Sequence, residues 1–248
     1  MPDNSVFQEF YLREIGVQTP LALHEASEPV TERDILSPSD EKPVMVSSED
    51  MVSVPSVDQV SSRGDSLQEI AMQASSCRAC ALSEQRQKVV FGVGNPNADI
   101  VFIGEAPGHE EDLNGEPFVG RAGHLLDRML LSQGMDRSQV YIMNTVKCRP
   151  PNNRDPKPEE VQACGKWFDA QLRALSPKLI CLLGRVAAQT VLETDAPLSA
   201  MRGKWHEYHG IPLRVMYHPA YLLRSPQQKR HVWHDLCELQ KRYQLLLA

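Results

Sequence analysis

Short apolar runs recur along the second part of the chain, and each has the length and content of a buried strand. The four runs are Asp99–Gly104 (DIVFIG), Val140–Asn144 (VYIMN), Lys178–Gly184 (KLICLLG) and Pro212–His218 (PLRVMYH). Apolar residues at helical spacing separate or follow them in Arg121–Gln133, Pro158–Leu175, Arg185–Leu192 and Gln228–Leu247. Strands that alternate with helices form parallel sheets covered on both faces. The pattern therefore predicts an α/β fold of three layers (αβα) around a central, mostly parallel four-stranded sheet.

The first part of the chain lacks this pattern. Residues 25–63 are rich in Ser, Pro, Val and acidic side chains, which cannot bury enough apolar surface to offset the entropy of ordering. Ahead of them, residues 7–23 contain a short amphipathic segment, which is typical of a docking peptide. We therefore predict an acidic, largely disordered leader with a short helical N-terminal peptide over residues 1–62, followed by one domain over residues 63–248.

Charge divides the chain at the same place. Residues 1–62 carry twelve Asp and Glu against three Lys and Arg, a net of −9; residues 63–248 carry twenty against twenty-three, a net of +3; the sum is the overall −6. A mildly basic domain behind an acidic leader can meet a polyanion such as nucleic acid. The chain lacks both the long apolar run of a membrane span and the basic and apolar segments of a secretory signal. We expect a cytoplasmic protein without membrane contact.

Six cysteines in such a chain indicate a reducing compartment, where thiols bind metals or stay free. Cys181 lies in an apolar run and Cys237 in an amphipathic helix, so burial explains both. The other four fall in loops or at helix edges: Cys77, Cys80, Cys148 and Cys164. The first two form a C-x2-C pair, and four thiolates suit either structural zinc or an iron–sulfur cluster. One reactive pair beside two unrelated thiols is the remaining interpretation.

Glycine-rich and polar segments follow the predicted strands, at the edge where a parallel sheet binds its ligands. After the first strand comes GEAPG, made of Gly104, Glu105, Ala106, Pro107 and Gly108. Its N–H groups and carboxylate can approach an anion or a sugar closely, although a tight turn with an exposed Glu is the alternative. Phe118, in PFVGRAG, offers a ring that either stacks on a base or plugs the core.

Two further strand ends carry side chains that form hydrogen bonds. Asn144 ends the second strand, and its amide both donates and accepts, as reading an imide edge requires; a simple cap is the alternative. His218 ends the fourth strand and begins HPAYLLR, where a buried, satisfied histidine is the alternative to a functional one. In this segment we expect Leu222 and Leu223 to be exposed on a loop beside Arg224, where apolar side chains insert into a base stack.

Together these motifs resemble the bacterial family 4 uracil-DNA glycosylases, the iron–sulfur branch of the uracil-DNA glycosylase superfamily. The resemblance runs from Cys77 to about Trp233 and rests on GEAPG (104–108), EPFVGRAGHLLD (116–127), YIMNTVKCRPPNNRDP (141–156), PKLICLLG (177–184) and YHPAYLLR (217–224). It implies that family's fold and an enzyme of base excision repair. Such an enzyme flips deoxyuridine out of DNA, hydrolyses its N-glycosidic bond and leaves an abasic site. A non-catalytic iron–sulfur module that binds damaged DNA and a zinc-stabilised nucleotide-binding domain are the alternatives.

The resemblance also implies a cofactor and roles for the pocket residues. The four cysteines in loops or at helix edges would hold a structural [4Fe-4S] cluster. Phe118 would stack on the extruded uracil, Asn144 would bond its N3–H and O4, and His218 would donate to O2. Main-chain and side-chain groups of residues 104–108 would complete the substrate pocket.

Three further expectations concern the residue that positions the attacking water, the residue that excludes thymine and the residues that contact DNA. Some related branches place an Asp where this chain has Ala106, so Glu105 is the first candidate to position the attacking water, ahead of Glu111 and Asn144. Glu111 is also a candidate to exclude the methyl group of thymine. The residues expected to contact DNA are Arg121, Arg224, Leu222 as the first wedge into the minor groove, and Leu223 as the second.

The leader carries a second, shorter resemblance. QEFYLREIGVQTPL, within residues 7–23, is similar to the N-terminal peptide of the bacterial clamp-loader psi subunit, which docks on the chi subunit. It implies a contact with the clamp-loader chi subunit in addition to uracil-containing DNA. Otherwise we expect a monomer.

Overall fold

The computed structural model describes residues 57–247. The peptide at residues 7–23 and the predicted leader as far as residue 56 therefore lie outside the described residues. Helix α2 (Val57–Ser75) begins six residues ahead of the predicted domain boundary at residue 63.

A six-stranded sheet forms the centre of the domain, in the order β1-β3-β2-β4-β6-β5. Its strands are β1 (Val93–Gly94), β2 (Ile100–Gly104), β3 (Tyr141–Asn144), β4 (Leu179–Leu183), β5 (Trp205–Tyr208) and β6 (Ile211–Met216). The four predicted strands pair in parallel as β3-β2-β4-β6, and the short strands β1 and β5 join the two edges antiparallel. The prediction of a mostly parallel sheet is confirmed, with two edge strands added.

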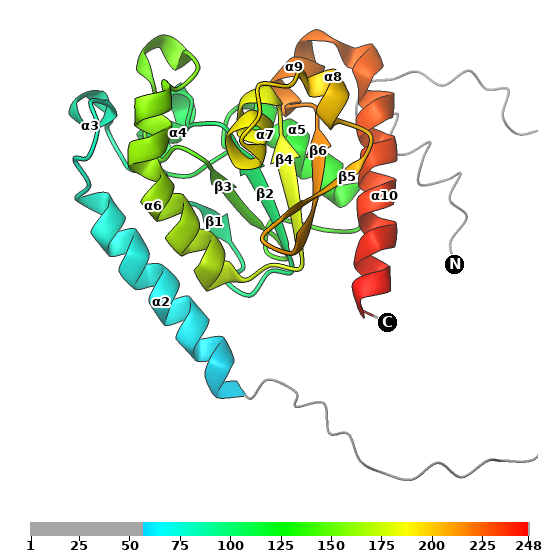
Figure 1. Ribbon diagram of the computed structural model, residues 1–248, viewed down its shortest axis with the longest axis horizontal. Helices are drawn as coiled ribbons and strands as arrows, with labels where there is room; N and C mark the ends of the chain where they lie inside the picture. The colour runs from blue at the N-terminus through cyan, green and yellow to red at the C-terminus, as the bar shows by residue number, and fades with distance from the viewer. Residues whose placement is uncertain (1–56, 248) are drawn as a thin grey trace, which may run out of the picture.

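Helices cover both faces of this sheet, which gives three layers (Figure 1). After α2 they are α3 (Leu82–Gln85), α4 (His109–Asn114), α5 (Arg121–Leu131), α6 (Pro158–Leu175), α7 (Arg185–Leu192), α8 (Leu198–Met201), α9 (Pro219–Arg224) and α10 (Lys229–Leu247), with 3₁₀ turns at Pro151–Asn153 and Pro226–Gln228. Successive side chains of β2 point to opposite faces of the sheet, and each face packs against its own helices. Phe102 packs with α5, α9 and α10, while Val101 and Ile103 pack with α2, α6 and α7. Within residues 57–247, no helix is long and apolar enough to cross a membrane.

The segment after β6 differs from its prediction as an exposed loop. Pro219 occupies the first helical position of α9, and Nδ1 of His218 accepts a hydrogen bond from the Ala220 N–H, so a short capped helix forms. The helix turns Leu222 into the core, where it is fully buried, and leaves Leu223 half-buried against the same core. The expectation that Leu222 is exposed is therefore wrong, because packing has already removed this side chain from water.

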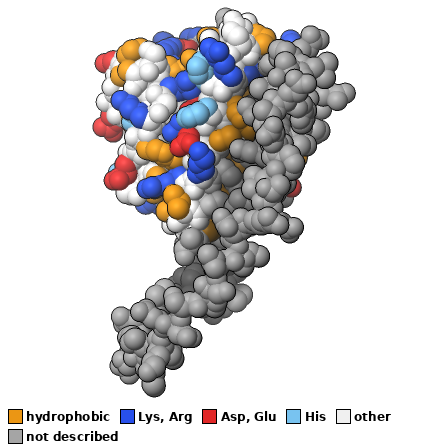
Figure 2. Space-filling view, turned by 90° about the vertical axis from the view of Figure 1, so that its right-hand side faces the viewer, with side chains coloured by type: hydrophobic (Ala, Val, Ile, Leu, Met, Phe, Trp, Pro, Cys, Tyr) orange, Lys and Arg blue, Asp and Glu red, His pale blue; other side chains and the backbone are white. Residues whose placement is uncertain are grey.

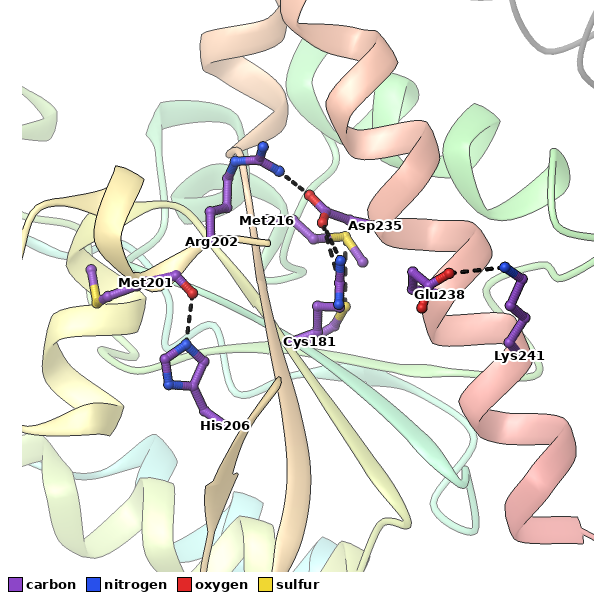
Figure 3. Close-up of polar contacts among 9 residues, drawn as sticks. Cys181, Met201, Arg202, His206, Met216, Asp235, Glu238 and Lys241 are labelled. Atoms are coloured by element: carbon purple, nitrogen blue, oxygen red, sulfur yellow. Dashed lines mark hydrogen bonds and ion pairs between the residues drawn. The ribbon is translucent and has the colours of Figure 1, made fainter. Parts of the chain in front are cut away.

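A buried charge network ties α10 to the sheet (Figure 3). Asp235, on α10, is 1% exposed and accepts hydrogen bonds from Arg214 of β6 at 2.8 and 3.2 Å. It also pairs with Arg202, which follows α8, and the guanidinium of Arg202 lies 4.4 Å from the ring centroid of Tyr217. The network therefore reaches the residue that precedes His218.

Candidate active site

The carboxyl ends of β2, β3 and β6 open onto one cavity of about 470 Å³. Its lining includes residues at or after the ends of three of the four predicted strands: Glu105, Ala106, Pro107, Gly108, Glu111, Phe118, Asn144, His218 and Arg224. Parallel pairing brings these motifs to the same edge of the sheet, although they are far apart in sequence. The cavity has the size of an ordinary small-molecule site.

Asn144 offers this cavity a buried amide. The side chain is at the end of β3 and is 2% exposed, and its Oδ1 has no hydrogen-bond partner among residues 57–247. Gly104 pairs with Asn144 in the sheet, and a Cβ at Gly104 would come within 2.4 Å of that oxygen. Because a buried acceptor without a partner costs free energy, the amide is suited to a ligand that donates a hydrogen bond.

Phe118 forms one wall of the cavity through an unusual backbone conformation. Its φ is 56°, and it is 6% exposed. Arg137 donates to the Phe118 carbonyl at 2.9 Å and to the Pro117 carbonyl at 2.7 Å, which holds this conformation. A Cβ at Gly123 would lie 1.7 Å from the same Phe118 carbonyl, so only glycine fits there. The aromatic ring is thus held rigidly, with its centroid 5.5 Å from that of His218.

His218 faces the cavity as a neutral imidazole. Its Nδ1 accepts the Ala220 N–H at 3.1 Å, so the proton of the neutral ring resides on Nε2. Burial, and after it the charge of Arg224, lowers the pKa of His218 to about 4. At neutral pH the ring is therefore a hydrogen-bond donor through Nε2–H and not a cation.

Two acidic side chains that line the cavity, Glu105 and Asp155, interact with each other. Burial raises the pKa of Glu105 to about 7, and the nearby charge of Asp155 adds to this shift while Arg185 opposes it. Asp155 itself pairs with Arg185 at 2.6 Å. A carboxyl group that titrates near neutral pH is suited to proton transfer.

Glu111 has a different role. Its Oε1 accepts the N–H groups of Val119 and Gly120, both at 3.1 Å, and its Oε2 accepts that of Gly108 at 3.1 Å. Both oxygens of this carboxylate are therefore engaged in holding the loop after Phe118 next to residues 104–108.

A second, smaller cavity collects the four cysteines predicted as metal ligands. Its lining includes Cys77, Cys80, Cys148 and Cys164, together with Arg86, Lys147 and Trp167. Arg86 donates to Cys148 Sγ at 3.3 Å, and the main-chain N–H of Lys147 donates to Cys164 Sγ at 3.3 Å. Within residues 57–247, no three His, Cys, Asp or Glu side chains converge so as to hold a single metal ion. The four thiols nevertheless line one shared cavity.

Comparison of the whole sequence with known proteins shows the family to which this chain belongs. Residues 91–237 match the model of the family described as the uracil DNA glycosylase superfamily. The chain is 48% identical over 179 residues to the type-4 uracil-DNA glycosylase of Archaeoglobus fulgidus, an alignment that covers 69% of this chain and 90% of that protein. The chain belongs to the type-4 uracil-DNA glycosylases. The type-4 enzyme of Thermotoga maritima is 42% identical over 181 residues, covering 70% of this chain and 93% of the relative. A type-5 enzyme of Thermus thermophilus is 35% identical, but only over 42% of this chain and 53% of the relative.

Several cavity residues of this type-4 chain were not singled out from the sequence. They are Ala122, Pro150, Asn153, Arg154, Asp155, Ala220 and Tyr221. Asp155 has the clearest chemical role among them, and its only sequence signal was its place in the segment RPPNNRDP after the second predicted strand. Arg154 is held at the rim by Glu160, which accepts from it at 2.6 and 2.8 Å.

The residues predicted to contact DNA lie in different environments. Arg224 lines the cavity, whereas Arg121 is exposed at the start of α5 and does not line it. Leu223 is half-buried, so it is more accessible than Leu222. Figure 2 shows the face on the α10 side of the molecule, where Lys and Arg side chains are interspersed with hydrophobic and acidic ones.

Proposed function

We propose that this chain releases uracil from DNA by hydrolysing the N-glycosidic bond of a flipped deoxyuridine. The observation that carries the proposal is the unpartnered Oδ1 of Asn144 inside the cavity, since the N3–H of uracil supplies the missing donor and O4 accepts from the amide nitrogen. Cytosine reverses this pattern, with an acceptor at N3 and a donor at N4, so it leaves the buried amide unpaired. The ring of Phe118 stacks on the extruded base.

The reaction follows from the polar groups around the base. When the C1′–N1 bond breaks, its electron pair leaves with the base and negative charge gathers on O2, where Nε2–H of His218 donates. Water then adds to the electron-poor C1′ of the sugar, and its proton passes to the carboxylate of Glu105. The products are an abasic site and uracil, which takes up a proton at N1. Glu105 serves here in preference to Glu111, because the oxygens of Glu111 are already engaged with main-chain N–H groups.

The decisive experiment offers four oligonucleotides to the purified full-length chain. They are identical except for a central U, T, C or hypoxanthine, and the released bases are quantified. We expect free uracil and an alkali-sensitive abasic site from the first, and no release from T or C. Binding to the uracil oligonucleotide without any release would favour the non-catalytic DNA-binding module instead.

The four cysteines of the smaller cavity are proposed to hold a [4Fe-4S] cluster. Each thiolate of such a cluster binds its own iron, so the four sulfurs surround a space wider than a single zinc ion fills. The four thiols line one cavity, and the motifs of the chain resemble the iron–sulfur branch, so both observations support the cluster over zinc. The bound cluster would supply structural stability, and about four irons per chain with matching sulfide would identify it. One zinc ion per chain and no iron would contradict the assignment.

Replacing His218 is expected to slow uracil release by about 10²- to 10³-fold, because the charge that develops on O2 loses its donor. His218→Asn is the informative variant, since its short amide can still accept the Ala220 N–H and cap α9. His124→Ala, on the exposed surface of α5, is the matched control and should keep the wild-type rate. Single-turnover release of uracil measures both, and wild-type rates in His218→Asn would remove this residue from the reaction.

The rate should depend on pH through Glu105. A carboxyl group with a pKa of about 7 is protonated in mildly acidic solution and cannot accept a proton from water. We therefore expect kcat/KM to rise with pH through about 7 and then level off, and Glu105→Gln to remove this rise along with much of the rate. His218, with its pKa near 4, does not titrate in this window. If kcat/KM of Glu105→Gln rose with pH as it does in the wild type, the pH dependence would belong to another group.

The leader is proposed to act outside the reaction. Residues 7–23 are proposed to dock on the clamp-loader chi subunit, and the whole protein to work as a cytoplasmic monomer. The sequence similarity of residues 7–23 to the psi peptide supports the contact. Binding of purified chi to the full chain, and its loss on deletion of residues 7–23 with unchanged uracil release, tests it.

A further inference from the structure

Lys147 is a buried charge that the proposed reaction does not use. It follows β3 three residues after Asn144, immediately before Cys148, and is 1% exposed. Lysine is rarely buried this fully, because removing an ammonium group from water costs several kcal/mol unless other groups compensate. Its surroundings therefore need an explanation.

The contacts of Lys147 reach both cavities. Its Nζ donates to the main-chain carbonyl of Asn144 at 2.7 Å and also to Oε1 of Gln171. The Gln171 amide in turn donates to the Phe91 carbonyl at 2.9 Å and to the Tyr141 hydroxyl at 3.1 Å, which fixes its orientation. The main-chain N–H of Lys147 donates to Cys164 Sγ. One residue thus contacts the strand end that presents the uracil-reading amide and a sulfur of the cysteine cavity.

The partners of the ammonium group are unusual. No carboxylate of residues 57–247 forms a salt bridge with it, and its two hydrogen-bond acceptors are neutral amide oxygens. Lys147 lines the cysteine cavity, whose other lining residues include all four cysteines and no carboxylate. The anionic groups nearest to this ammonium on that side are therefore thiolates.

We propose that Lys147 is a positioning residue that links the two cavities: its ammonium balances the charge of the thiolate-bound centre and, through the Asn144 carbonyl, fixes the strand end that reads uracil. The proposal rests on the proposed function and on the cysteine-bound cluster. Occupation of the cysteine cavity thereby keeps the ammonium in place, and the ammonium holds Asn144. A structural cluster would in this way support base recognition from the neighbouring cavity.

The test compares two lysines next to the cysteine cavity. Lys147→Met removes the buried ammonium at similar side-chain volume. Lys166→Met removes an exposed one, which lies over the ring of Trp167. One readout is the rate at which a chelator extracts iron from the purified protein; the other is kcat/KM for uracil release. We expect Lys147→Met to lose iron at least about tenfold faster and to lose about 10- to 100-fold in kcat/KM, and Lys166→Met to match the wild type.

A second variant separates the effect of the Lys147 charge from the effect of its position. It remains useful if Lys147→Met does not fold. Gln171→Met leaves the ammonium but removes the amide that orients it. We expect slower uracil release with nearly wild-type iron retention. Wild-type values of both readouts in Lys147→Met, or a wild-type excision rate in Gln171→Met, would overturn the proposal. A wild-type protein that carries iron but releases no uracil would contradict the proposed function instead, and iron retention would still test Lys147.

Discussion

Asn144→Ala is expected to release uracil at least about 10³-fold more slowly than the wild type. The substitution removes both the acceptor for N3–H and the donor for O4, and sites built on such hydrogen bonds lose several orders of magnitude when the pairing fails. The amide is closely packed, because a Cβ at Gly104 would collide with its oxygen and with the Phe118 ring. Single-turnover kinetics on a uracil oligonucleotide, with enzyme in excess, measures the effect on the chemical step.

The fold of Asn144→Ala should persist. The lost side chain had an unpaired oxygen, and the main-chain carbonyl that accepts from Lys147 remains. Thermal unfolding and iron content should therefore match the wild type. Asn97→Ala, an exposed asparagine ahead of β2, is the matched control and should excise normally. A variant at position 144 with near wild-type rates would show that uracil is read by other groups.

Asp235→Ala is expected to lower the free energy of unfolding by about 3–5 kcal/mol. The change leaves the guanidinium of Arg214, which is 2% exposed, buried without its carboxylate, and breaking one partner of a buried ion pair has this cost. Arg202 loses the same partner. Urea unfolding followed by circular dichroism measures the difference.

Glu238→Ala provides the control on the same helix. Glu238 lies about one turn after Asp235 and pairs with Lys241 at 2.9 Å in solvent, where the Lys241 side chain is 73% exposed (Figure 3). Surface pairs contribute at most about 1 kcal/mol, so this variant should unfold close to the wild type. Equal losses in the two variants would show that Asp235 contributes through its helix and not through its buried arginines.

The comparison of β2 with the edge strands shows which parts of the fold could be predicted. A strand buried on both faces is a continuous apolar run, and β2, β3, β4 and β6 were found from such runs. The edge strand β1 has two half-buried residues, and β5 mixes half-buried and exposed ones. Edge strands of this kind carry almost no hydrophobic signal, because they pair on one side only.

The segment after His218 shows that prediction from the sequence can also fail at the site itself. The pattern of Pro219, Leu222 and Leu223 was interpreted as an exposed loop, yet it forms a short helix that buries Leu222 beside α5 and α10. Six residues are too few for helical periodicity to be recognised. Whether an apolar side chain faces solvent or core then depends on neighbours that are distant in sequence.

The sequence alone determined the parallel sheet, the edge that carries the site and the residue types Phe118, Asn144 and His218, because buried strands and their ends have local signatures. Only the tertiary structure decided how these groups are used. It left the Asn144 oxygen unpaired, made His218 a neutral donor, engaged Glu111 with the main chain and brought Asp155 to Glu105. Protonation and hydrogen-bond satisfaction depend on burial and on partners from distant segments, and such information arises only when the chain has folded.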